Sequence, residues 1–203
     1  MIYLLTSRGC HIHSPSPLFS LTLCIIFLTG AALCIVAKDL EGNLRKAEAL
    51  FKKHPNKCKT LSSLLELERE SDIHNGNVLK DPSAAMGLLW IRRSLAFQSR
   101  LFESLLPSDG LHPKDAAMQA YYKTLSPYHG WLLQKIFPSS LSQMPHREVF
   151  LSTFGEIDLE DLGEDEETKI TRKLRALIST LDPLLAVWKD SFIELDLEDT
   201  RRV

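Results

Sequence analysis

The spacing of apolar residues constrains this chain most, because they recur every three or four positions from Lys38 to Phe192. That spacing places them on one face of an α-helix, whereas a half-buried strand would alternate apolar and polar residues. The last long segment shows the pattern most clearly, at Ile170, Leu174, Leu177, Ile178, Leu181 and Leu185. No segment after Lys38 has the alternation of a strand. The sequence therefore predicts an all-α fold.

Breaks in this pattern predict where one helix ends and the next begins. Pro55 cannot continue the first helix, and the Asn75-Gly76 pair favours a turn before the longest apolar stretch. The expected helical segments are 36–51, a second with Leu61, Leu64, Leu65 and Leu67 facing inward, 82–106, 114–125, 128–137, 146–154 and 168–192.

Two dipeptides favour particular helix starts. Asp81 followed by Pro82 is typical of an N-cap residue and a first helical position, and Ser126 with Pro127 repeats the combination. The second pair also allows a kink inside one long helix. We expect the acidic stretch 156–167 to be an exposed loop that supplies acids to the first turn of the last helix.

Composition argues against several classes of function. The 203 residues suffice for one domain, and a formal net charge of −2 provides no basic field for a nucleic acid partner. The four cysteines form no CxxC pair and the seven histidines are scattered, so we expect no metal site and a reducing compartment. The sequence has no GxSxG, P-loop, GxGxxG or HExxH motif. We therefore expect neither an enzyme nor a cofactor.

The N-terminal segment is apolar and allows three interpretations. No charged residue lies between Arg8 and Lys38. The stretch 17–37 is long enough to cross a bilayer, which needs roughly 20 residues. A cleaved signal peptide, a membrane anchor and a helix buried in a core all fit it. We favour the buried helix, with residues 34–36 packed against the longest helix, because they continue the apolar face of the first helix.

Asp39, Asn43 and Lys46 fall on one stripe of the first expected helix, at positions i, i+4 and i+7. A solvated face has no need of an acceptor, an amide and a cation together. Trp90 and His129 are each more typical of a core when taken alone. In combination with the stripe they form a set that holds a sugar, because acid and amide bind vicinal hydroxyls while an indole ring covers the apolar C–H face.

Three segments resemble the glycolipid transfer protein family. They are KDLEGNLRKAEALFKKHPNKCKTLSSLLELERE, AAMGLLWIRRSLAF and YHGWLLQKIF, and they carry the motifs DxxGNxxK, LLWxxR and YHGW in the family's order. The similarity covers residues 30–195. The resemblance implies an all-α fold of two helical layers that moves a sphingolipid from one membrane to another without a cofactor or a covalent step.

The resemblance also implies roles for individual residues. The side chains it places at the lipid headgroup are Asp39, Asn43, Lys46, Trp90 and Arg93. His129 would hydrogen bond the ceramide amide, and Trp131 would contact the membrane interface. The expected ligand is a glycosphingolipid, carried by a cytoplasmic monomer that touches membranes transiently.

The chain departs from the family at both ends. Residues 1–29 do not match it, and we treat them as an atypical apolar segment before a domain of residues 30–203. The C-terminal ELDLEDTRRV lacks the tyrosine with which family members often end. Two alternatives stay open: a ceramide 1-phosphate carrier, in which a cation is expected at the position of Trp90, and a membrane-anchored lipid-sensing module.

Overall fold

The computed structural model describes residues 31–106, 111–142, 144–152 and 165–203. These ranges contain no strand, and their helices are α2 (Ala31–Lys53), α3 (Leu61–Glu70), α4 (Ala84–Leu105), α5 (Pro113–Thr124), α6 (Trp131–Leu141), α7 (Arg147–Ser152) and α8 (Glu166–Glu194). The prediction of an all-α fold is confirmed. The segment 1–29, the side chains of residues 34–36 and most of the acidic stretch 156–167 lie outside the description, so the predictions made for them stay predictions.

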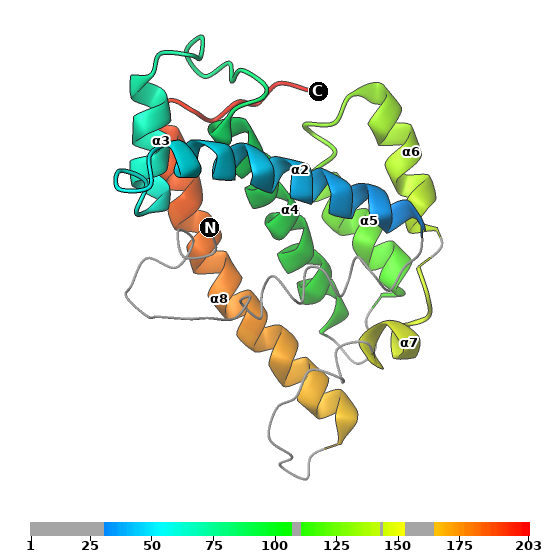
Figure 1. Ribbon diagram of the computed structural model, residues 1–203. Coiled ribbons are helices and arrows are strands. Elements are labelled where there is room, and N and C mark those ends of the chain that lie inside the picture. Colours follow the sequence, from blue (N-terminus) through cyan, green and yellow to red (C-terminus); the bar gives the residue numbers. More distant parts are fainter. Residues whose placement is uncertain (1–30, 107–110, 143, 153–164) are drawn as a thin grey trace.

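Helix α4 lies at the centre of the fold. It packs most extensively against α2, α5 and α8. Figure 1 shows α2 lying across α4, with α4, α5 and α8 behind it, which gives the expected arrangement in two layers. The stripe on α2 and the central helix that carries Trp90 are therefore neighbours.

The buried apolar residues form two clusters that meet at Trp90. The first joins α2, α3, the start of α4 and the end of α8, and the second joins the rest of α4 to α5, α7 and the start of α8. Trp90 is half-buried and packs against both clusters. The sequence pattern correctly placed Ile170, Leu174 and Leu181 in the core.

The start of α4 differs from the expected Asp81 cap. The N-cap is Ser83, whose hydroxyl accepts a hydrogen bond of 3.1 Å from the Met86 amide. The buried carboxylate of Glu68, on α3, accepts the first two amides of α4, those of Ala84 (2.8 Å) and Ala85. The prediction was wrong because a side chain distant in sequence supplies the acceptors that a helix N-terminus needs.

The connection between α5 and α6 also differs from expectation. Ser126 and Pro127 lie in a turn, and α6 begins later, with Gly130 as its N-cap. Neither the predicted cap at Ser126 nor a kink within one continuous helix is present. The turn places His129 in the interior and Trp131 at the surface.

Residues 195–203, which follow α8, form an ordered C-terminal strap that contacts the α3–α4 and α5–α6 connections. Val203 exchanges backbone hydrogen bonds with Tyr128 (2.9 Å) and Gly130 (2.7 Å). Earlier in the strap, the buried Asp199 carboxylate accepts a hydrogen bond of 2.9 Å from the Leu79 amide, just before α4. In Figure 1 the strap, in red, runs past the start of α4. The strap therefore links the end of α8 to the segments that lead into α4 and α6.

None of the described helices has the length and apolar character of a membrane-spanning segment.

Candidate functional site

The predicted stripe on α2 is a hydrogen-bonded chain of three side chains. The Asn43 amide nitrogen donates to the Asp39 carboxylate at 3.0 Å, and the Lys46 ammonium donates to the Asn43 carbonyl oxygen at 3.2 Å. Asn43 is buried, whereas Asp39 is exposed. These hydrogen bonds orient the Asn43 amide, and the Asp39 carboxylate remains accessible to a ligand.

A glycine allows α4 to approach this stripe closely. A Cβ added at Gly87 would lie 2.4 Å from the backbone oxygen of Asn43 and 3.1 Å from the Lys46 Cβ. Any other residue would force the two helices apart. Trp90 follows Gly87 by one turn of α4, so the close crossing sets the indole beside the α2 stripe.

The charges around the stripe are dominated by carboxylates. Lys46 forms an ion pair of 2.7 Å with Asp81, in the segment before α4. Desolvation raises the pKa of the Asp39 carboxyl and the charge of Asp81 adds to the rise, although Lys46 and Asn43 oppose it. The site thus holds two carboxylates and one cation.

Trp90 and His129 lie together at the junction of the two core clusters. Their rings stack with centroids 5.4 Å apart. The hydroxyl of Tyr121, on α5, lies 3.2 Å from His129 Nδ1, and no described residue bonds the other ring nitrogen, Nε2. Desolvation, and then the positive charge of Arg93, lower the pKa of His129. The imidazole is therefore neutral near pH 7, with one nitrogen left for a ligand.

Arg93, on α4, contacts the Trp90 ring and the C-terminal strap. It is only 5% exposed, and its guanidinium carbon lies 5.3 Å from the Trp90 ring centroid and 3.5 Å from that of Tyr128. The guanidinium also donates to the backbone oxygen of Asp199. The structure shows Arg93 joining Trp90 to the C-terminal strap, and its contact with a headgroup stays a prediction.

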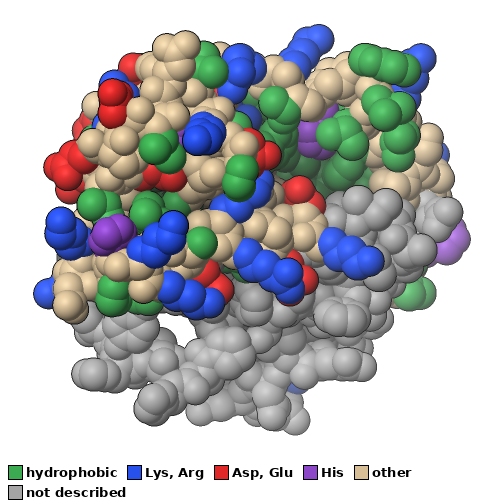
Figure 2. Space-filling model, turned by 45° about the horizontal axis from the view of Figure 1, so that its top comes forward, with side chains coloured by type: hydrophobic (Ala, Val, Ile, Leu, Met, Phe, Trp, Pro, Cys, Tyr) green, Lys and Arg blue, Asp and Glu red, His purple; other side chains and the backbone are tan. Residues whose placement is uncertain are grey.

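An exposed apolar surface lies on α6. Trp131 is 69% exposed, and Leu132, Leu133 and Ile136 on the same helix are also exposed. Figure 2 shows hydrophobic side chains gathered over this part of the molecule. The Lys135 ammonium lies 5.2 Å from the Trp131 ring centroid, so the surface combines apolar groups with a cation. Such a combination is typical of a membrane-contacting helix.

The interior next to His129 is apolar and rich in aromatic rings. Phe137, on α6, stacks on Tyr121 with centroids 4.6 Å apart and meets the edge of Phe97, on α4, at 6.0 Å. Small residues line α5 behind them, with Ala117 and Ala120 buried. This second cluster is the apolar region that contacts His129.

Among the described residues, no group of three or more His, Cys, Asp or Glu side chains is placed to hold a metal ion. Cys58, the one cysteine whose side chain is described, is buried and unpaired.

Several residues of the site were not predicted from the sequence. Asp81 was assigned to a helix cap, and Tyr121 and Tyr128 were not singled out. Tyr121 could have been found from its spacing, because it falls on the inward face of α5 with Ala117. The ion pair between Asp81 and Lys46 had no signal in the sequence, because it depends on how the α3–α4 connection folds.

The same elements are found in known proteins. The glycolipid transfer protein family model matches residues 18–156. The chain belongs to the glycolipid transfer protein family. The match contains the α2 stripe, Trp90, His129 and Trp131.

Relatives and solved structures agree with this assignment. Glycolipid transfer protein A of Xenopus laevis is 30% identical over 174 residues, which cover 83% of this chain and 81% of that protein. Glycolipid transfer protein 1 of Arabidopsis thaliana is 33% identical over 126 residues, 62% of this chain and 60% of that protein.

Two solved structures share the fold at lower sequence identity. The structure of FAPP2, described as selecting simple glycosphingolipids with the GLTP-fold, has a TM-score of 0.76 at 24% identity and covers 90% of this chain and 84% of its own. Mouse ceramide-1-phosphate transfer protein has a TM-score of 0.75 at 18% identity, with 89% and 85% covered. These likenesses concern the fold alone.

Proposed function

We propose that this chain carries glycosphingolipids between membranes and catalyses no reaction on them. The observation that carries the proposal is the ordered stripe of Asp39, Asn43 and Lys46, set beside Trp90 by the close helix crossing at Gly87. Sugar hydroxyls would donate to Asp39 and accept from Lys46 and Asn43, while the indole covers a ring face.

The charge of the site favours a sugar over a phosphate. Asp39 and Asp81 provide two negative charges, and Lys46, the one cation between them, is already paired with Asp81. A phosphate monoester placed there would be repelled by the carboxylates. An uncharged sugar avoids that repulsion. The charge balance therefore supports a glycolipid cargo over ceramide 1-phosphate.

The ceramide part would enter the apolar cluster beside His129. The free Nε2 of His129 would meet the ceramide amide, and the Tyr121 hydroxyl holds the ring in place. Each buried CH2 of a lipid chain contributes about 0.8 kcal/mol, so only an apolar interior can compete with a membrane for it. Phe97 and Phe137 fill this interior, so they would have to move to admit the chains.

Helix α6 is the element best placed to move. Of its residues only Leu141, at its end, is buried, and its packing against α5 and α2 is light. Its exposed Trp131 would insert at the membrane interface, where an amphipathic indole is stable. Contact with a membrane would then open the path to the interior at the place where the lipid is available. We propose a cytoplasmic monomer that binds membranes peripherally for this exchange.

Transfer between vesicles tests the proposal. Donor vesicles would carry fluorescent glucosylceramide or ceramide 1-phosphate with the same fluorescent chain, and the rate of movement to acceptor vesicles would be measured. We expect transfer of glucosylceramide. Transfer of ceramide 1-phosphate alone would support the phosphate carrier, and binding without transfer would support a lipid sensor.

Asp81→Asn tests the charge argument in the same assay. The substitution removes a negative charge from the site without touching Asp39 or Trp90. We expect it to raise transfer of ceramide 1-phosphate relative to glucosylceramide. An unchanged ratio of the two rates would show that the charge of Asp81 does not set the choice of headgroup.

A further inference from the structure

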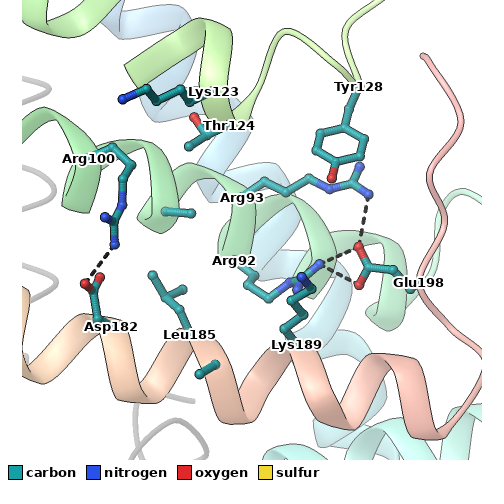
Figure 3. Close-up of a pocket in the computed structure, with 12 residues that line it drawn as sticks. Arg92, Arg93, Arg100, Lys123, Thr124, Tyr128, Asp182, Leu185, Lys189 and Glu198 are labelled. Atoms are coloured by element: carbon teal, nitrogen blue, oxygen red, sulfur yellow. Dashed lines mark hydrogen bonds and ion pairs between the residues drawn. The ribbon is translucent and has the colours of Figure 1, made fainter. Parts of the chain in front are cut away.

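A polar cavity lies between α4, α8 and the end of α5, and no residue of the α2 stripe lines it. Its volume is about 350 Å³, within the range of sites for small ligands. Its charged lining, shown in Figure 3, consists of Arg92, Arg93, Arg100, Lys123, Lys189, Asp182 and Glu198. Positive groups exceed negative groups by three.

The two carboxylates are fully engaged with arginines. Both oxygens of Glu198 accept hydrogen bonds of 2.6 Å from Arg92, and one lies 3.6 Å from Arg93. Asp182 forms an ion pair of 2.7 Å with Arg100. Arg100 also pairs at 2.6 Å with Glu103, which lies outside the lining. Lys123 and Lys189 have no ion pair among the described residues, so two of the positive charges are not neutralised within this part of the chain.

Burial distinguishes this cluster from an ordinary basic surface. Arg92 and Arg93 are 7% and 5% exposed, and the Nε atom of each has no hydrogen-bond acceptor among the described residues. Desolvation lowers the pKa of Arg93, and the positive charge of Arg92 adds to the effect. Two buried cations that share one carboxylate leave the cavity with a positive potential that an anion would relieve.

We propose that this cavity binds a phosphomonoester dianion, from a lipid headgroup or from a small soluble phosphate. Lys123 and Lys189 line it from α5 and α8 with flexible side chains, and the arginines of α4 supply the fixed part of the field. Arginine and lysine form strong charge-assisted hydrogen bonds with phosphate oxygens. The cavity is distinct from the α2 stripe, and Arg93, which lies 5.3 Å from the Trp90 ring centroid, is the residue that adjoins both.

Two probes with the same phosphomonoester group distinguish the sources. Glycerol 3-phosphate is the soluble probe, measured by titration calorimetry. Phosphatidylcholine vesicles with and without phosphatidic acid are the lipid probe, measured by flotation. Binding of glycerol 3-phosphate indicates a soluble ligand, and binding to phosphatidic acid vesicles alone indicates a headgroup. Both results support the proposal, and absence of binding to either probe would overturn it.

Charge variants assign the binding to this cavity. We expect the double variant Lys123→Ala, Lys189→Ala to weaken binding about tenfold or more, because it removes two charge-assisted contacts. The matched control is Lys57→Ala, Lys59→Ala, which removes the same charge from exposed positions outside the cavity. Equal weakening by both double variants would mean nonspecific attraction and would overturn the proposal.

Asp182→Asn should act in the opposite direction. It removes one of the two carboxylates that pair with Arg100, the other being Glu103, and raises the positive charge of the cavity. We expect tighter binding of the probe that the wild-type chain binds. Damage to the fold would weaken binding instead, so a gain of affinity is a result that a merely structural role cannot produce. Unchanged or weaker binding by a variant with wild-type thermal stability would count against the site.

Discussion

Neutralising Asp39 should weaken glycolipid binding while leaving the fold intact. In Asp39→Asn the shape of the side chain is kept but its charge is lost. Hydrogen bonds to a charged group contribute about 1.5–3 kcal/mol and neutral ones about 0.5–1.5 kcal/mol. With two sugar hydroxyls on the carboxylate, the loss is about 1–3 kcal/mol, roughly 5- to 150-fold in affinity.

The structure indicates why stability should not fall. Asp39 is exposed, and Lys46 keeps its ion pair of 2.7 Å with Asp81 when the Asp39 charge is removed. The assay is transfer of fluorescent glucosylceramide between vesicles, combined with thermal unfolding of each variant. Glu41→Gln is the matched control, because Glu41 lies on the same helix and is exposed, but pairs with Arg45 away from the stripe.

Two results would refute this reasoning. Asp39→Asn with a wild-type transfer rate would show that the carboxylate does not bind the headgroup. Equal losses in Asp39→Asn and Glu41→Gln would show that the net charge of α2, rather than a hydrogen bond at Asp39, controls transfer.

Three further predictions concern membrane contact through α6, the capping of α4 and the pH dependence of stability. Trp131→Ala should reduce vesicle binding and transfer without changing the melting temperature, since the ring is mostly exposed; a lower melting temperature would mean a packing role. Glu68→Ala should lower the free energy of unfolding in urea by about 1–3 kcal/mol, because two amides at the start of α4 lose their acceptor; no loss would contradict that capping role. The folded-state pKa of His129 lies below the unfolded value of 6.5, so its contribution to stability should be lost as pH falls below that value; His129→Asn should flatten this pH dependence, and an equal slope in both proteins would contradict it.

The helices and the α2 stripe could be predicted because both depend on residues close in sequence. An apolar residue every three or four positions fixes a helix and its inward face, and the same period aligned Asp39, Asn43 and Lys46. Trp188 and Phe192 extend the inward stripe of α8 and are fully buried. Periodicity predicts an inward Trp188, because it follows Leu185 by three positions.

The remaining features depend on contacts between distant residues. Ser83 rather than Asp81 caps α4, and Glu68, on another helix, accepts the first two amides of α4. The polar C-terminus had no apolar pattern to suggest an ordered strap, yet Asp199 is buried through its bond to Leu79. Similarly, the contacts of Arg93 with Asp199 and Glu198 had no signal in the sequence, and its headgroup role, which the resemblance implies, stays a prediction.

The most direct test of the cargo is to identify what the protein removes from a membrane. The full-length chain would be incubated with vesicles that contain equal amounts of glucosylceramide, ceramide 1-phosphate and sphingomyelin, separated from them, and examined by native mass spectrometry. We predict one glucosylceramide bound per chain, with a reduced share in Asp39→Asn and an unchanged share in Glu41→Gln. Recovery of ceramide 1-phosphate in place of glucosylceramide, or of no sphingolipid, would contradict the proposed function.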